Sequence, residues 1–459
     1  MSCSREKSEL PVSTGAAHRC CIVPPYLLHC VAESDKWSDE IKAAAHNSLK
    51  FANPFHELRI QALSNIAGGE TSGSGPTPLQ AHGMVPDFLL KTFEETKNVD
   101  KETKKSLEQG SLLSKLLRES RRKAVEAAAQ IPPMPRKVRE IHDMNHKEDL
   151  TKLPGDLIYS EANIPPPEGG WSDATAQDCY QNLGHVFDYY HKVHSRNSIN
   201  GNGLTLTASV HFGKSFPNAL WQGSQMVFGD GNKVFKNFTK SLDIIGHELT
   251  HGVVQFTAGL LYDGQPGALN ESLADVFGSL VKQWRAGQTT SEADWLIGED
   301  CMLPDVKGVA LRSLKAPGKA FDVSNVGKRD PQPRTMDDYV VTTDDYGGVH
   351  INSGIPNHAF YLVAKGATDA GLSDHAWEVA GAIWYLALHH GDMHPRCNFE
   401  QFAKLTYNIA RTEYGDKAAK VVEDAWKSVK VPLRLELLLQ TPKVMSRLKT
   451  LQDSRRTSI

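Results

Sequence analysis

The chain has 459 residues, of which 40% are hydrophobic and 23% are charged, and its formal net charge at pH 7 is −3. This length can bury sizeable cores and predicts two or three domain-sized units. The charge balance gives no reason to expect nucleic acid or an anionic membrane as a partner. No run of eighteen or more apolar residues occurs, so no transmembrane helix is predicted.

The N-terminus and the cysteines bear on where the protein works. The first apolar stretch, residues 21–31, is broken by two prolines and a histidine and makes a poor signal-peptide core. The seven cysteines show no C-x-x-C spacing, which argues against a disulfide framework and against a thiolate zinc site. We therefore expect a cytoplasmic protein, with secretion by a route that needs no signal peptide as the alternative.

The first 135 residues divide into three stretches of different composition. Residues 1–66 carry a Pro-Pro-Tyr-Leu-Leu segment at 24–28 and the pattern of a short amphipathic helix at 35–47. A Gly/Ser/Pro-rich stretch at 68–78 cannot pack a core and predicts a linker. Residues 86–130 predict a helix dense in Lys, Arg and Glu, which is either a partner-binding helix or, as for most such charge runs, a solvated face.

Residues 136–240 are dominated by strand patterns. The stretch 204–212 alternates and is rich in Thr and Val, and a Gly-Asp-Gly turn follows at 229–231. One long helix, predicted over 174–194, interrupts these strands. We expect a β-rich lobe over this part of the chain.

The sequence His-Glu-Leu-Thr-His at 247–251 predicts a metal site on a helix. Positions four apart lie on one helical face, so His247 and His251 can bind one zinc ion together. Glu248 can reach a metal-bound water without being a ligand. For the five residues alone, a chance match with two ordinary histidines is the alternative, because the chain has 19 histidines.

A third ligand is expected, because catalytic zinc has three protein ligands and one open position. Asn-Glu-Ser-Leu-Ala-Asp at 270–275 begins nineteen residues after His251, past a loop expected at 257–267, and continues as a helix. Such a helix can present Glu271 to the metal, and Asp275, one turn later, can accept the other ring N–H of a liganding histidine. Taken alone, Glu271 could also be a solvated carboxylate at a helix start.

The remainder, residues 267–431, is mainly helical in pattern, for example at 377–389 and 398–414. A second histidine group at 389–394 is not expected to bind metal, because a glycine and a proline interrupt its helical spacing. The leucine-rich tail at 432–459 predicts no function.

Together the two zinc motifs resemble those of the thermolysin-like neutral metalloproteases, the glutamate zincins, in order and in spacing. Residues 217–231 are similar to the substrate-binding edge strand and adjoining loop of that family, and 311–313 and 347–354 match two further motifs. The resemblance covers roughly residues 136–431. Within the family, residues 241–246 and 280–283 are most similar to the protealysin branch.

The resemblance implies an α+β fold, a two-lobed thermolysin-like protease domain with a β-rich N-terminal lobe, a mainly helical C-terminal lobe and the zinc helix between them. The boundaries it suggests are a propeptide with the Pro-Pro-Tyr segment (1–66), a linker and charged insert foreign to the family (67–135), the N-terminal lobe with the zinc helix (136–256), the helical lobe (257–431) and a tail (432–459).

The implied activity is zinc-dependent hydrolysis of peptide bonds, with one catalytic zinc ion and Glu248 as general base and then general acid. The resemblance adds residues around the metal: His350 and Tyr262 as donors to the oxyanion, Asp345 as the partner of His350, and Asn218, the Ala219 backbone and Arg312 as contacts to an extended peptide. For Tyr262 and Arg312, packing or a salt bridge is the alternative.

Two further implications concern specificity and calcium. The family's pocket on the leaving-group side maps onto apolar residues, which implies cleavage before Leu, Phe, Ile or Val: Phe235, Phe238, Ile244, Ile297 and Leu311. Its double calcium site maps onto a set that has lost two carboxylates and gained an ammonium: Asp243, Lys282, Asp294, Leu296 and Glu299. Because calcium takes 6–8 oxygen ligands, we expect the calcium site to be reduced or absent.

The expected partners are protein or peptide substrates and, second, a protease inhibitor, and the expected state is a monomer. An inactive relative that only binds peptides would need to lose Glu248 or a metal ligand, and all are present. A stable zymogen or effector protease, active only after processing or partner binding, stays open because of the long N-terminal region.

Overall fold

In a computed structural model, the described residues are 20–52 and 137–433, apart from 22, 24, 34–36, 163–170, 215, 232–234, 236–237, 302–306 and 324–327. The linker expected at 68–78, the charged insert expected at 86–130 and almost all of the tail expected at 432–459 lie outside the described residues.

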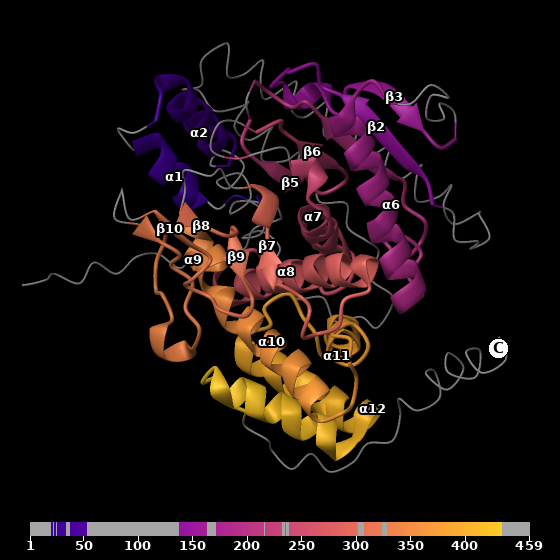
Figure 1. The fold of residues 1–459 in the computed structure, drawn as a ribbon, viewed down its shortest axis with the longest axis vertical. Coiled ribbons are helices and arrows are strands. Elements are labelled where there is room, and N and C mark those ends of the chain that lie inside the picture. The colour runs from indigo at the N-terminus through magenta and orange to yellow at the C-terminus, as the bar shows by residue number, and fades with distance from the viewer. Residues whose placement is uncertain are drawn as a thin grey trace, which may run out of the picture.

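The upper lobe in Figure 1 is built on a six-stranded sheet in the order β1-β5-β6-β4-β2-β3. Its strands are β1 (Cys20–Cys21), β2 (Arg139–Asp143), β3 (Asp156–Ser160), β4 (Leu206–Val210), β5 (Ala219–Trp221) and β6 (Met226–Phe228). The sheet is mixed, because β4 pairs in parallel with β2 and β6 whereas β1, β3 and β5 pair antiparallel with their neighbours.

One long helix, α6 (Ala174–His194), packs against this sheet and has the bounds expected from the sequence. It starts where it does because the side chain of Asp173 accepts hydrogen bonds from the first free N–H groups, those of Thr175 and Ala176. It ends at Ser195, whose φ of 53° is left-handed and stops the helix.

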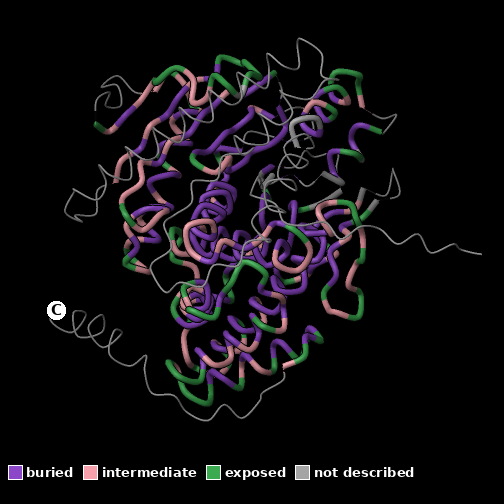
Figure 2. Tube along the Cα trace, turned by 180° about the vertical axis from the view of Figure 1, so that it is seen from behind, coloured by how far each residue is buried: buried purple, intermediate pink, exposed green. Residues whose placement is uncertain are grey.

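Two helices at the centre of the molecule, α7 (Leu242–Gln255) and α8 (Gly264–Ala286), carry both zinc motifs. Every residue from 243 to 254 is buried, so α7 is covered on all sides rather than on one apolar face, and Figure 2 shows both helices as mainly purple tube. The helices approach closely at two glycines: a Cβ on Gly278 would lie 2.5 Å from the Asp243 carbonyl oxygen, and one on Gly246 would lie 3.0 Å from Gly278 Cα. The close packing of α7 against α8 thus depends on having glycine at both positions.

The lower lobe is mainly helical and contains α9 (Asp345–Asn352), α10 (Gly354–Asp369), α11 (Ala380–Leu388) and α12 (Phe399–Ser428). Two small sheets lie beside them, one of β7 (Leu296–Ile297) with β9 (Arg312–Ser313), the other of β8 (Lys307–Gly308), β10 (Phe321–Val323) and β11 (Lys328–Arg329). Short 3₁₀ turns occupy Leu150–Lys152, Phe238–Lys240, Glu299–Cys301 and Met336–Asp338. The expected α+β, two-lobed fold with the zinc helix between a sheet-containing and a helical lobe is therefore what the structure has.

Several helix bounds differ from the expectations. The N-terminal pair is α1 (Pro25–Glu33) and α2 (Asp39–Ala52), so the helix expected at 35–47 starts later, after Ser38, whose carbonyl accepts the N–H groups of residues 41 and 42. The loop expected at 257–267 ends earlier, because α8 begins at Gly264. In the C-terminal lobe, α12 continues past a kink at Gly415 to Ser428. Among the described helices, none has the length and hydropathy needed to cross a bilayer.

Candidate active site

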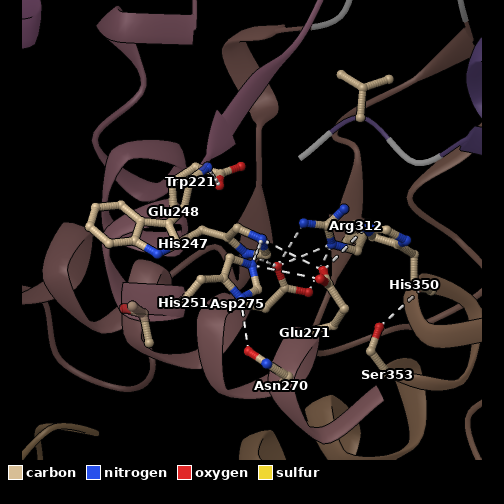
Figure 3. Close-up of polar contacts among 12 residues, drawn as sticks. Trp221, His247, Glu248, His251, Asn270, Glu271, Asp275, Arg312, His350 and Ser353 are labelled. Carbon is tan, nitrogen blue, oxygen red and sulfur yellow. Dashed lines mark hydrogen bonds and ion pairs between the residues drawn. The ribbon is translucent and has the colours of Figure 1, made fainter. Parts of the chain in front are cut away.

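Three buried side chains from the two central helices converge on one point. The nearest ligand atoms of His247, His251 and Glu271 all lie within 4.8 Å of one another, and each residue is at most 1% exposed. Within the described part of the chain, this is the one group of three such side chains close enough to share a metal ion. Figure 3 shows the two imidazoles on α7 pointing toward the carboxylate on α8.

Hydrogen bonds fix the orientation of both imidazoles. Nδ1 of His247 lies 2.8 Å from Asp275 Oδ1, and Nδ1 of His251 lies 2.8 Å from Asn270 Oδ1. Both partners accept, so each ring carries its proton on Nδ1 and turns an Nε2 lone pair inward. The two Nε2 atoms are then 2.9 Å apart.

This donor set fits a zinc ion. Two inward nitrogen lone pairs at that distance repel each other unless a cation lies between them and the carboxylate. Two imidazoles and one carboxylate form a ligand set of catalytic zinc sites, which leave a fourth position open. Burial lowers the pKa of His251 to about 3 and keeps that ring neutral. Burial alone would raise the pKa of Glu271, but the positive charges of His350 and Arg312 oppose it, and that pKa is lowered to about 2.

Glu248 lies beside the metal ligands and is held by the edge of the sheet. The backbone N–H of Trp221 on β5 donates to Glu248 Oε2 at 2.8 Å, and the carboxylate is 0% exposed. Figure 3 shows Trp221 and Glu248 together above His247. This backbone hydrogen bond orients the carboxylate expected to act as the base.

His350 and Tyr262 meet on the opposite side of Glu271. The Tyr262 hydroxyl donates to Glu271 Oε1 and lies 3.2 Å from His350 Nε2. Asp345 accepts from the ring Nδ1 of His350 at 2.6 Å and from its backbone N–H at 2.8 Å. Burial would lower the pKa of His350, but the charges of Asp345 and Glu271 outweigh it and raise that pKa to about 9. The ring is therefore protonated at neutral pH and can donate from Nε2.

Arg312, expected to contact substrate, is 0% exposed and forms an ion pair with Asp275. Its Nε lies 2.8 Å from Asp275 Oδ2, and its Nη2 lies 2.8 Å from Asp275 Oδ1. The carboxylate of Asp275 therefore holds both the metal-ligand His247 and this guanidinium. A salt bridge was the alternative role left open for Arg312 in the sequence analysis, and Arg312 does form one with Asp275.

The edge strand expected to bind substrate already has a partner in the chain. β1 pairs antiparallel with β5, with Cys21 opposite Leu220 and Cys20 opposite Trp221. Asn218 Oδ1 accepts from the backbone N–H of Val23 at 3.0 Å, and Asn218 Nδ2 donates to the Val23 carbonyl at 3.3 Å. An extended N-terminal segment thus occupies the edge next to Ala219.

The sequence reasoning missed three contacts of this site. Asn270 orients His251, the Trp221 backbone orients Glu248, and Asn357 Nδ2 donates to Asp275 Oδ2 at 2.9 Å. The position of Asn270, directly before a ligand, could have indicated its role. The other two depend on residues that lie 27 and 82 positions away in the chain, which local patterns do not show.

Comparison with known proteins decides the family. Residues 124–255 match the thermolysin metallopeptidase catalytic domain, and residues 258–431 match the thermolysin metallopeptidase alpha-helical domain. An extracellular metalloprotease from Pectobacterium carotovorum subsp. carotovorum is 45% identical over 301 residues, which cover 65% of this chain and 83% of that protein. The chain belongs to the thermolysin family of metalloproteases. The resemblance stated from the zinc motifs is confirmed, and the chain is a zinc-dependent peptidase acting on proteins or peptides.

Other relatives agree with this assignment. Protease PrtS from Photorhabdus sp. (strain Az29) is 46% identical over 302 residues, which cover 65% of this chain and 77% of that protein. A thermolysin from Bacillus sp. (strain EA1) is 39% identical over 286 residues, which cover 61% of this chain and 49% of that protein. The solved precursor of protealysin, a metalloproteinase from Serratia proteamaculans, matches with a TM-score of 0.66 at 34% identity, over 90% of this chain and 100% of that chain.

The expectation of a cytoplasmic protein is wrong. The relative at 45% identity is named an extracellular metalloprotease, which points to secretion. The expectation was based on the poor signal-peptide core at residues 21–31, which does not exclude secretion by another route. The described thiols of Cys179 and Cys397 do not report the compartment, because both are buried. Burial raises the pKa of Cys179, and that of Cys397 to about 12, so both thiols stay protonated and unreactive in either compartment.

Proposed function

We propose that this metalloprotease is an endopeptidase made as a precursor, whose own N-terminal segment lies in the substrate position until it is cut. The observation that carries the proposal is the pairing of β1 with β5, together with the two hydrogen bonds between Asn218 and the Val23 backbone. Val23 is 0% exposed. Peptides that add a strand to a sheet edge use the same main-chain hydrogen bonds.

The proposed division of the chain follows from this arrangement. Residues 1–66 would be the propeptide, 136–256 and 257–431 the two lobes of the protease, and 67–135 the segment in which processing occurs. A monomer is the state that we propose for the processed enzyme. A protein inhibitor that binds the same edge of β5 would compete with the N-terminal segment.

The proposed mechanism assigns a task to each side chain of the site. His247, His251 and Glu271 would hold a zinc ion, which would supply Lewis-acid polarisation of the scissile carbonyl and would lower the pKa of a water to about 7. Glu248, with Oε2 held by the Trp221 amide, takes the proton of the attacking water and delivers it to the leaving amine.

The remaining residues bind the substrate and the developing negative charge. His350, protonated through its contact with Asp345, and the Tyr262 hydroxyl would donate to the oxyanion from Nε2 and Oη. Asn218 and the Ala219 backbone would hold the extended peptide, and Arg312, fixed by Asp275, would donate to a substrate carbonyl.

The proposed specificity is for large hydrophobic residues on the leaving-group side of the cut bond. The five residues expected to form that pocket are each at most 2% exposed: Phe235, Phe238, Ile244, Ile297 and Leu311. A buried apolar side chain of the substrate would add ~1.5–3 kcal/mol to discrimination. Mass spectrometry of a digested peptide library should show cuts mainly before Leu, Phe, Ile or Val. Cuts mainly before Asp, Lys or Gly would refute the assignment of the pocket.

We also propose that an ammonium group stands where relatives of the family hold calcium. Lys282 Nζ lies 2.6 Å from Asp294 Oδ2, 3.7 Å from Glu299 Oε2 and 4.0 Å from Asp243 Oδ2. The single positive charge of the ammonium offsets part of the negative charge of these three carboxylates, as a bound metal ion would. The double calcium site would then be absent or reduced.

A stable zymogen or effector protease, active only after processing or partner binding, is the second candidate. The same pairing of β1 with β5 supports it, because an uncut segment would keep the edge strand occupied. Incubating the full-length chain with casein, with and without a zinc chelator, separates the two. Chelator-sensitive digestion that follows N-terminal cutting supports the precursor, and no digestion by the cut chain supports the partner-dependent effector.

A further inference from the structure

The turn that delivers Asp345 to His350 has an unusual backbone. Four consecutive residues at the start of α9 have positive φ: 52° at Asp345, 54° at Tyr346, 80° at Gly347 and 75° at Gly348. The two glycines accept this conformation readily, and Asp is among the residues that adopt it. A bulky tyrosine at φ 54° and ψ 45° is an outlier. Such strain persists where the surrounding structure imposes it, often at functional sites.

The Tyr346 side chain packs against the side of the active site. Its ring centroid lies 5.6 Å from that of Tyr262 at an interplanar angle of 59°. Tyr262 and Val349 form a small buried cluster of their own, and Tyr346 is the partly buried residue that packs against it. The Tyr262 ring thus packs with Val349 and Tyr346, while its hydroxyl reaches Glu271 and His350.

We propose that Tyr346 is a positioning residue of the peptidase reaction. Its ring holds the Tyr262 phenol in the position from which the hydroxyl can donate to the oxyanion. The inference rests on the donor role given to Tyr262 in the proposed function. The Tyr346 ring is the partly buried contact of this phenol, and removing it would let the phenol tilt away from Glu271 and His350. An asparagine at position 346 would suit the left-handed backbone better than tyrosine, so its substitution removes the ring without adding backbone strain.

The strongest test combines Tyr346→Asn with Tyr346→Phe, which keeps the ring and removes only the hydroxyl. For Tyr346→Asn we expect kcat to fall roughly tenfold, less than the ~10²-fold that a 1 Å misplacement can cost. KM should stay within about twofold, because the interaction lost belongs to the transition state. The zinc content and the melting temperature should not fall, since the replacement relieves backbone strain. Tyr346→Phe should keep the activity of the wild type.

A double-mutant cycle shows whether Tyr346 acts through Tyr262. In a Tyr262→Phe background, Tyr346→Asn should cause little further loss of kcat, because the hydroxyl that it positions is gone. Lys430→Asn is a matched control, since Lys430 also has a left-handed φ, 61°, but lies on the surface after α12. It should leave kcat unchanged.

Three results would overturn the inference. The first is an unchanged kcat in Tyr346→Asn while Tyr262→Phe is impaired. The second is an equal loss of kcat in the two backgrounds. The third is a fall in melting temperature that parallels the loss of activity and marks a structural role. A wild-type kcat in Tyr262→Phe would instead show that the proposed donor role of Tyr262 is wrong, and the inference would fall with it.

Discussion

Glu248 is the residue at which proton transfer and metal binding can be separated. Its carboxylate is oriented by the Trp221 amide and is not among the three metal-binding groups. Glu248→Gln should therefore keep zinc while losing at least ~10²–10⁴ in hydrolysis rate. His251→Ala should instead lose the metal. Zinc content by mass spectrometry and peptide hydrolysis, measured on both variants, check this. Near-normal hydrolysis by Glu248→Gln would contradict the mechanism.

A second residue-scale prediction concerns stability at alkaline pH. His211 Nδ1 lies 2.7 Å from Asp230 Oδ1, and its Nε2 lies 2.9 Å from Asp173 Oδ2. The hydrogen bond to Asp230 and then that to Asp173 raise the pKa of His211 to about 9, although burial opposes them. The folded-state pKa exceeds the unfolded value of about 6.5, so the stabilisation is complete below about pH 6.5 and lost as pH rises through about 9.

Chemical denaturation across that interval measures this effect. The free energy of unfolding of the wild type should fall more steeply with pH than that of His211→Gln, which has no imidazole to deprotonate. His146, 3.4 Å from Asp230, is present in both proteins and cancels in the comparison. Parallel pH profiles would show that the His211 contacts do not stabilise the fold.

At the scale of elements, Lys282 links the end of α8 to the segment around β7. Lys282→Met should lower the free energy of unfolding by about 1–3 kcal/mol, because it leaves carboxylates facing one another. Breaking a fully buried ion pair costs ~3–5 kcal/mol, and this larger loss is not expected because the Lys282 side chain is 27% exposed. The exposed i,i+4 pair of Lys365 with Asp369 is a matched control, and Lys365→Met should leave the free energy of unfolding nearly unchanged.

The same geometry predicts weak dependence on calcium. Selective removal of calcium with zinc retained should leave the melting temperature of the wild type nearly unchanged, as differential scanning fluorimetry can show. A large drop in the melting temperature would count against the proposed loss of the calcium site. In Lys282→Met, added calcium should recover part of the lost stability.

The elements that are easiest to predict from the sequence are those whose bounds are set by neighbouring residues. The helix α6 has a capping Asp173 and a continuous pattern, and its bounds were expected as observed. The early start of α8 at Gly264 and the full burial of α7 were not expected, because they follow from packing between helices rather than from periodicity. The left-handed turn at Tyr346 could not be predicted either, since tyrosine disfavours that backbone and only tertiary contacts impose it.

For the molecule as a whole, the proposed function makes the N-terminal segment the control on substrate binding. If residues 20–23 block the edge of β5, the uncut chain should be slow, and cutting within about residues 50–135 should activate it. N-terminal sequencing of the wild type beside Glu248→Gln identifies the agent: a cut that vanishes in the variant indicates self-cleavage. Full activity of an intact, unprocessed chain would remove the propeptide assignment.

The whole-molecule features were also the hardest to predict. The pairing of Cys21 with Leu220 and the contact of Val23 with Asn218 span 195 or more positions, and a Pro-Pro-Tyr segment alone does not specify a partner. The compartment was predicted wrongly because a poor signal-peptide core at residues 21–31 is a local pattern that does not exclude secretion by another route. Local patterns identified the chemistry of the site, whereas long-range contacts determine what covers it.

The three metal-binding groups come from both lobes, His247 and His251 from α7 and Glu271 from α8. An ion bound only by the folded state adds RT ln(1 + [metal]/Kd) to its stability, about 2.7 kcal/mol at a hundredfold excess over Kd. Zinc is then a cross-link between the lobes as well as a cofactor. Copies without zinc open more often and become substrates for copies that hold it. A population short of zinc would therefore digest its own inactive members.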